Sequence, residues 1–229
     1  MPPELIPTRE EKVHLLKYVL LASSAFALAV LNPAQAQQKI DWSGLHAGLE
    51  AGPAWGQARS EASGHFGISS VDAVLSLGYN KQFDSGLVAG VEFDLSPARG
   101  LFGNVTRSQL LGPRGPTLDT RYNTRVNWAA APRINLGYAM GRFLPYATLG
   151  YLYGEATSTG FATVRGFPVG HETHFSTLRG PIIGAGVQYS LNERWSVGGE
   201  FLYTNAKASG IGGGGLAVKA ALVGAQYHF

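Results

Sequence analysis

The sequence has no cysteine, which excludes a disulfide framework and a thiolate metal site. Charged residues are scarce, at 14% of the chain, and the formal net charge of +3 is spread along it. A nucleic-acid-binding protein would instead concentrate its basic residues on one stripe. What the chain has in abundance is glycine, with 31 residues, and aromatic residues, at 11%. Much glycine and aromatic residue with little charge is typical of β-structure.

The first 36 residues have the features of a secretory signal peptide. Basic residues precede an uncharged run from Tyr18 to Leu31, and Ala34-Gln35-Ala36 supplies the small residues of a cleavage site. Such a run rises only about 21 Å as a helix, short of the roughly 30 Å hydrocarbon core. We therefore expect cleavage after Ala36, export through the inner membrane, and a mature domain of residues 37–229.

The mature chain alternates between apolar and small or polar residues with a period of two, which is typical of β-strands. Eight such segments follow one another. They span residues 45–55, 71–80, 87–96, 122–138, 146–154, 183–191, 196–204 and 220–229.

The connections between these segments alternate in length. Three are short, at 80–86, 141–142 and 192–194, and four are long, at 56–70, 97–120, 155–172 and 205–215. Short turns at one end and long loops at the other are the layout of an outer-membrane barrel. The sequence thus predicts an all-β fold, an eight-stranded antiparallel up-and-down transmembrane barrel. Its turns would be periplasmic and its four long loops extracellular.

Alternation alone does not say which face points outward, since a soluble ligand-binding barrel is polar outside and apolar within. Here the less apolar face is mostly glycine, serine, asparagine and glutamine, which suits a confined interior. Aromatic residues also gather at both ends of the apolar face, as in the aromatic girdles of membrane barrels. The predicted girdle residues are Trp55, Tyr79, Phe93, Trp128, Tyr138, Tyr153, Tyr189, Trp195 and Tyr203.

Four stretches resemble the small porin-like outer-membrane β-barrel family, the immunogenic outer-membrane proteins of alphaproteobacteria. They are W-S-G-L-H-A-G at 42–48, the hairpin of 133–138 and 144–150, the hairpin of 184–189 and 195–203, and the aromatic end at 227–229. The resemblance implies an eight-stranded barrel like that of OmpA in the bacterial outer membrane. It also implies that Tyr227 and Phe229 form the C-terminal signal read by the barrel-assembly machinery.

Three residues depart from this pattern. Pro132 and Pro181 fall within predicted strands, where proline removes a hydrogen-bond donor and favours a bulge or a strand end. Lys219 falls on the outward face, about ten residues from the chain end, where a cation near the membrane interface costs little.

Charged residues on the inward face predict a polar network inside the barrel. An eight-stranded barrel is just wide enough to be filled by side chains. Counting from the short turns places Glu50, Asp72, Glu92, Arg133 and Glu200 within a layer of about 8 Å. We expect Arg133 to bridge several carboxylates, which cannot all be comfortably ionised. A charged constriction in a narrow ion pathway is the alternative.

The sequence offers little else for chemistry. His174-Phe175-Ser176 contains a histidine and a serine, as a lipid-A-modifying hydrolase would, but no acid is placed to orient the histidine. His171, Glu172 and His174 do not have the spacing of a zinc-binding helix. We therefore expect no catalytic, metal or cofactor site.

The leading prediction of function is a structural barrel that supports envelope integrity and displays surface antigen. A narrow porin-like channel is second and a lipid-A-modifying enzyme is third. The expected partners are outer-membrane lipids and lipopolysaccharide, together with periplasmic chaperones and the barrel-assembly machinery. The barrel would be a monomer or a weak homo-oligomer, with no nucleic-acid partner.

Overall fold

The computed structural model describes residues 40–60, 64–97, 102–110, 117–165, 167–209 and 214–229. The chain divides into two compact units, Met1–Gln38 and Lys39–Phe229, and all described residues lie in the second. The predicted signal peptide, residues 1–36, is outside them. The strands are β1 (Gly44–Ser60), β2 (Gly64–Gln82), β3 (Leu87–Ser96), β4 (Phe102–Leu110), β5 (Thr117–Tyr138), β6 (Phe143–Val164), β7 (Phe167–Ser190), β8 (Trp195–Ser209) and β9 (Gly214–His228). Among these residues no helix is long and apolar enough to cross a membrane.

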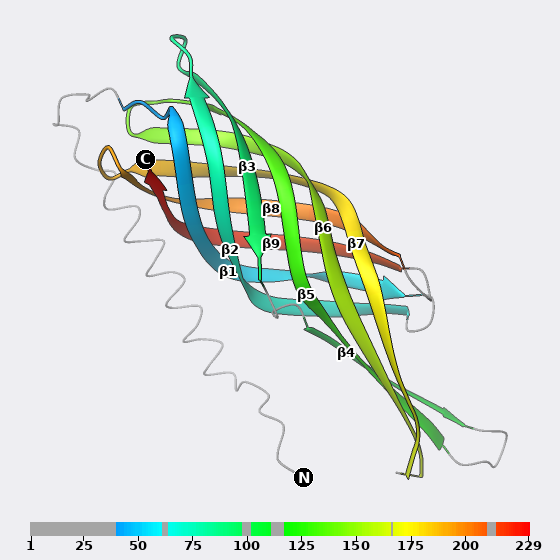
Figure 1. The fold of residues 1–229 in the computed structure, drawn as a ribbon. Helices are drawn as coiled ribbons and strands as arrows, with labels where there is room; N and C mark the ends of the chain where they lie inside the picture. The colour runs from blue at the N-terminus through cyan, green and yellow to red at the C-terminus, as the bar shows by residue number, and fades with distance from the viewer. Residues whose placement is uncertain (1–39, 61–63, 98–101, 111–116, 166, 210–213) are drawn as a thin grey trace. The chain divides into compact units, whose positions relative to one another are not determined.

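Eight of these strands form a closed antiparallel ring. Each strand pairs with the next, and β9 pairs with β1 to close the circle (Figure 1). The predicted eight-stranded barrel is therefore confirmed. The short turns that join β2 to β3, β5 to β6 and β7 to β8 lie at the same end as Gly44 and Phe229, the periplasmic end in a barrel of this kind.

The ninth strand, β4, was not predicted and lies within the expected loop 97–120. It pairs with residues 117–125 of β5, whereas β3 pairs with residues 129–138 of the same strand. β4 therefore continues the line of β3 along β5 toward the extracellular side. Closing a hairpin against the long strand β5 satisfies backbone hydrogen bonds that a loop would leave to water.

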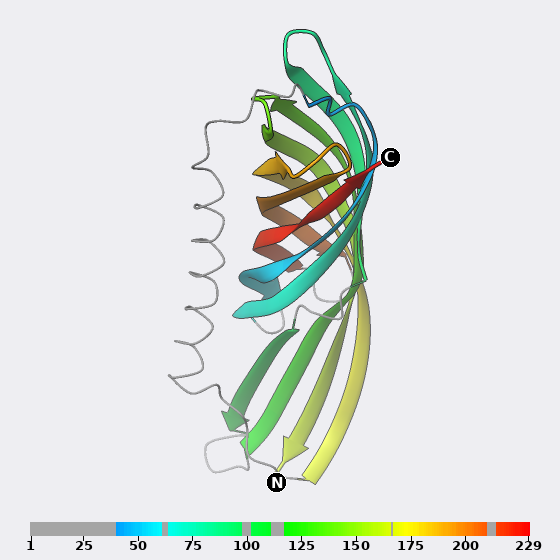
Figure 2. The same cartoon turned by 90° about the vertical axis from the view of Figure 1, so that its left-hand side faces the viewer.

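The other strands also run further outward than predicted. The expected loop 155–172 is instead a paired continuation of β6 and β7, whose ladder extends from Phe143↔Tyr189 to Val164↔Phe167. Figure 2 shows the outer parts of β5, β6 and β7 continuing, with β4, past the ends of the other strands. This region combines polar residues with threonine and phenylalanine, which favour β-strands, and this composition is compatible with a solvated sheet.

Side chains alternate between the outer surface and the interior as the pattern predicts. On β6, Leu149 is 51% exposed and its neighbour Thr148 is 5% exposed. On β1, Leu49 is 56% exposed and Glu50 is 6% exposed. The apolar residues thus face outward along the barrel wall, which is the arrangement of a membrane barrel.

The alternation predicts the wrong side-chain direction for the outer part of β5. The alternation in the predicted strand 122–138 places Val126 on the outer face together with Trp128, but Val126 is 6% exposed and packs inside with Ala156 and Leu178. The β5–β6 register shifts between Val126 and Trp128. The extra residue at this bulge, Asn127, reverses the facing of every side chain beyond it.

The prolines leave gaps in the ladders without bulges. Pairing between β5 and β6 stops at Ala130↔Tyr153 and resumes in the same register at Arg133↔Gly150, on either side of Pro132. Pro181 interrupts the β7–β8 ladder in the same way, and Thr204 Oγ1 donates to its carbonyl oxygen at 2.9 Å. The expectation of a bulge or strand end at these prolines is therefore wrong, because a missing donor removes a bond without adding a residue.

A charged side chain at mid-height on the outer wall should destabilise the barrel. Leu149→Arg would place a guanidinium near the centre of the bilayer, which costs about 2–4 kcal/mol of folding free energy. Urea unfolding of the barrel refolded in vesicles, followed by tryptophan fluorescence, measures this loss. The matched control is Lys219→Leu near the interface, where the change should stay within about 1 kcal/mol. Equal stability of Leu149→Arg and the unmodified chain would contradict a lipid-facing wall.

Candidate functional site

The centre of the barrel interior is occupied by the guanidinium of Arg133, which reaches acids on two other strands. Its Nη1 donates to both carboxylate oxygens of Glu200, on β8, at 3.0 and 2.9 Å. Its Nη2 donates to Glu92, on β3, and its Nε forms an ion pair with Asp94 at 2.7 Å. All four side chains are buried. Arginine suits this position because its planar group binds several carboxylates at once and stays charged.

Two further side chains extend the network around the ring. His46 on β1 contacts Glu92 through Nε2 at 3.1 Å, and the hydroxyl of Tyr146 on β6 donates to Glu200 at 3.1 Å. The network therefore ties together β1, β3, β5, β6 and β8. Because removing one partner of a buried pair leaves a charge without compensation, these contacts depend on one another.

Two glycines make room for the network. A Cβ on Gly150 would lie 2.7 Å from Cγ of Arg133, and a Cβ on Gly186 would lie 2.7 Å from the hydroxyl of Tyr146. Both distances are below ordinary van der Waals contact. Glycine on the inner face of β6 and β7 thus lets Arg133 and Tyr146 extend into the interior.

Of the five predicted network residues, the structure brings together Arg133, Glu92 and Glu200. Glu50 lies beside Glu200, close enough for their carboxyl groups to interact directly. Asp72 is not part of this cluster. It is half-buried and accepts hydrogen bonds from Ser96 Oγ at 2.7 Å and from the backbone of Ala73 at 2.9 Å.

Asp94, which was not predicted, takes the place expected for Asp72. Asp94 pairs with Ser76 of β2, so Asp72 lies four residues further along β2, toward the extracellular side. His46 and Tyr146 were not predicted either. All three residues lie on the predicted inward face of their strands, and Asp94 is two residues from Glu92 on β3; this inward position is the signal that would have identified them.

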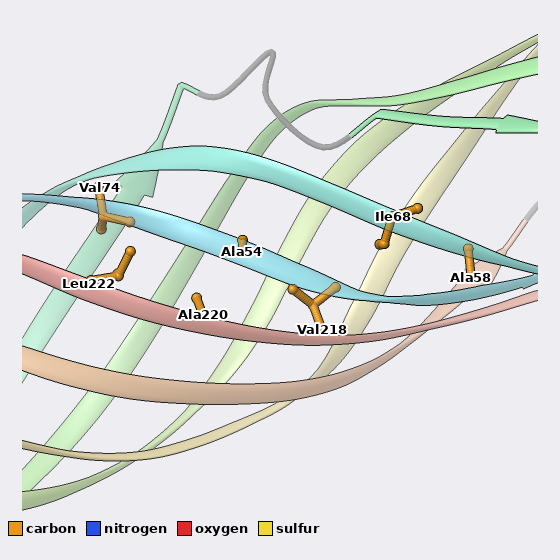
Figure 3. Close-up of a cluster of buried hydrophobic side chains, with 7 residues drawn as sticks. All are labelled: Ala54, Ala58, Ile68, Val74, Val218, Ala220 and Leu222. Carbon is orange, nitrogen blue, oxygen red and sulfur yellow. The ribbon is translucent and has the colours of Figure 1, made fainter. Parts of the chain in front are cut away.

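Apolar layers lie on both sides of the network. On the periplasmic side Trp42 is 1% exposed and packs with Ile40, Val88 and Leu144. On the extracellular side a larger cluster comes from β1, β2 and β9 (Figure 3). Its members are Ala54, Ala58, Ile68, Val74, Val218, Ala220 and Leu222. The interior is therefore not polar throughout, because apolar clusters that exclude water lie on either side of the central network.

The cavities within these layers are small. One of about 10 Å³ lies between the periplasmic apolar layer and the network, beside His46, Asn135 and Gln188. Another of about 90 Å³ lies in the extracellular apolar region, lined by residues such as Leu152, Leu178 and Leu202. A single water molecule needs a cavity of about 10–15 Å³. Among the described residues, the network lies between these two small spaces.

The predicted girdle residues all lie on the outward face. Trp128 and Tyr153 contact each other with ring centroids 5.7 Å apart, and Trp195 contacts Tyr227 at 5.1 Å. The extracellular group consists of Trp128, Tyr153, Trp55 and Tyr203. The periplasmic group consists of Trp195, Tyr79, Tyr138 and Tyr189. Phe93 pairs with Pro132, nearer the periplasmic end than Trp128, so it lies between the two groups.

The C-terminal residues lie at the seam where the ring closes. The backbone N–H of Phe229 donates to the carbonyl of Leu45 at 3.0 Å, and its exposed ring packs edge-on against Tyr227 at 5.1 Å. The aromatic end is thus part of the outer wall beside β1.

The histidines of β7 are far from the network along their strand. His174 is hydrogen-bonded to Glu172 at 3.2 Å, so an acid does lie beside it, although the sequence analysis placed none there. His171 is on the opposite face of β7 and contacts Phe161. Among the described residues, no group of three or more His, Asp or Glu side chains is placed to hold a metal ion.

A closed antiparallel ring with an apolar outer wall, aromatic residues near both ends and a filled interior defines the class of small outer-membrane β-barrels. Residues 24–229 match the outer membrane protein beta-barrel domain, and the chain belongs to this family. The predicted resemblance and the predicted outer-membrane location are thereby confirmed.

The 31 kDa outer-membrane immunogenic proteins of Brucella melitensis and Brucella suis are each 31% identical to the chain over 180 residues, 72% of either chain. Among solved structures, Neisserial surface protein A has a TM-score of 0.47 and 14% identity. That comparison covers 82% of this chain and 98% of the neisserial one.

Removing the central cation should destabilise the barrel strongly. Arg133→Ala leaves three buried acids without their partner, which costs about 3–5 kcal/mol. The measurement is the urea midpoint, or the temperature at which the band on a gel shifts to its unfolded position. Arg194→Ala in the exposed turn 191–194 is the control, with an expected change within about 0.5 kcal/mol.

A second variant tests the cause of this loss. Combining Arg133→Ala with Glu92→Gln, Asp94→Asn and Glu200→Gln removes the unpaired charges, so part of the lost stability should return. An unchanged midpoint for Arg133→Ala would show that the network does not brace the barrel.

Proposed function

We propose that the chain is a closed, non-enzymatic barrel that contributes to the integrity of the bacterial outer membrane. The observation that carries this proposal is Arg133, which spans the interior between two acids of β3, Glu92 and Asp94, and one acid of β8, Glu200. A side chain held across the interior both blocks passage and links opposite parts of the wall. The apolar layers on either side of the network support the same role.

The barrel should not conduct ions. In planar lipid bilayers the purified protein is expected to give no stepwise current, because the bound guanidinium and the apolar layers leave no continuous water path. The fourfold variant of Arg133, Glu92, Asp94 and Glu200 serves as comparison, since it loosens the centre. Resolved channels from the unmodified protein would favour the second candidate, a narrow channel in which this cluster is the constriction.

The proposal also holds that the barrel does not modify lipid. Glu172 and His174 form two parts of a possible catalytic arrangement, but His174 has no hydrogen bond to Ser176 among the described contacts. The protein incubated with radiolabelled lipid A should release no label above the His174→Ala variant. Release that depends on both His174 and Ser176 would contradict the non-enzymatic role.

The extracellular sheet supports a second part of the proposal, display at the cell surface. Relatives of this chain are named immunogenic outer-membrane proteins. The paired outer ends of β6 and β7 carry large exposed side chains such as Phe167 and Phe175. These residues lie beyond the extracellular girdle, so antibodies reach them on intact cells.

Biogenesis and association complete the proposal. The exposed ring of Phe229, beside Tyr227 at the seam, is available to the barrel-assembly machinery before the ring closes. Periplasmic chaperones would hold the apolar outer face until then. The barrel is then a monomer or a weak homo-oligomer.

A further inference from the structure

Two cations lie directly side by side on the outer wall of the barrel. Arg179 of β7 and Lys207 of β8 are paired in the β7–β8 ladder, and both side chains are exposed. Residues opposite each other in an antiparallel pair have Cβ atoms about 4.5–5.5 Å apart. Like charges at this separation repel and destabilise the sheet, so an anion that compensates both charges would stabilise it.

None of the ion pairs among the described residues supplies this compensation. Those pairs involve Arg133, His46 and His174 with their acids. The acid nearest to Arg179 on the outer face is Glu155, whose carboxylate accepts a hydrogen bond from Asn127 Nδ2 at 2.9 Å. Arg179 itself lies over the ring of Tyr153, with its Cζ 5.1 Å from the ring centroid. The aromatic ring fixes the guanidinium without neutralising it.

The pair lies at the level of lipid headgroups. Arg179 and Lys207 are each about ten residues from the periplasmic ends of their strands, which is the length of one transmembrane strand. Tyr153, under the guanidinium, belongs to the extracellular girdle. Lys219, a third exposed cation, pairs with Trp55 and Tyr203 of the same girdle. Cations therefore follow the aromatic residues at the outer edge of the bilayer.

We propose that Arg179 and Lys207 bind a phosphate group of the lipid that surrounds the barrel in the outer leaflet, lipopolysaccharide. A phosphate between the two side chains replaces their repulsion with two charge-assisted contacts. The planar guanidinium supplies paired donors and the lysine a point charge. Thr177 and Ser209, the next outward pair, place hydroxyl groups beside the cations. This inference rests on the proposed function, since a barrel that supports the envelope must hold its lipid.

The test compares binding of three probes to the purified, folded barrel in detergent micelles. The probes are lipid A with its two phosphates, the same lipid A after enzymatic removal of both, and inorganic phosphate. Arg179→Gln/Lys207→Gln should weaken binding of phosphorylated lipid A about 30-fold, because each cation near an anionic lipid contributes a factor of about five. Binding of dephosphorylated lipid A should not change.

The matched control is Lys81→Gln/Arg194→Gln, which removes two exposed cations at the periplasmic end. It should leave the affinity for lipid A unchanged within about twofold. Arg179→Lys is a milder variant that keeps the charge and loses the paired donors, and it should weaken binding by less than the double variant.

Three outcomes would overturn the proposal. Unchanged affinity of the double variant for phosphorylated lipid A would show that Arg179 and Lys207 do not bind it. An equal loss of affinity in the control would show that the attraction is general and not specific to these two residues. Displacement of lipid A by an equal concentration of inorganic phosphate would make it a site for the free ion. Bilayer conductance is measured separately on the same variants, so an open channel would count against the proposed function and not against this site.

Discussion

The barrel depends on one buried cation and the acids around it. Arg133 holds Glu92, Asp94 and Glu200 from the inside, while hydrocarbon surrounds the wall on the outside. A charged group in so narrow a space is tolerated only when groups of opposite charge compensate it. The position of every neighbouring strand is therefore tied to the geometry of one guanidinium. Glycine at 150 on β6, directly beside Arg133, and at 186 on β7 is the corresponding requirement on the neighbouring strands.

The alternation of apolar and small residues, with the alternating lengths of the connections, was enough to predict the closed ring, the end at which its short turns lie and its apolar outer face. This pattern is informative because a shift by one residue would turn the entire apolar face of a strand inward. The local exception is the bulge at Asn127. A single extra residue in a long strand is not marked by a distinctive residue type, so the sequence does not reveal the bulge. Val126 was assigned to the wrong face as a result.

The membership of the network was harder to predict than its existence. Counting from the turns gives the height of a residue along its own strand, but the contact between two residues depends also on the stagger between strands. That stagger places Asp94, and not Asp72, beside Arg133. The apolar extracellular half of the interior was missed for a related reason. Residues such as Val74, Leu152 and Leu222 occur singly among small inward neighbours, and only the closed ring brings them together.

The continuous pairing of β6 with β7 beyond the membrane limits how this surface can change in evolution. In a hairpin bonded along its whole length, one inserted residue turns every side chain beyond it to the other face. Insertions and deletions are therefore tolerated when they occur in matched numbers on both strands, or when a bulge absorbs them, as the irregularity between Ala162 and Thr163 does. Lineages of this protein should therefore differ in hairpin length by matched insertions on β6 and β7 or by single residues taken up in a bulge, while substitutions accumulate freely on the solvated positions.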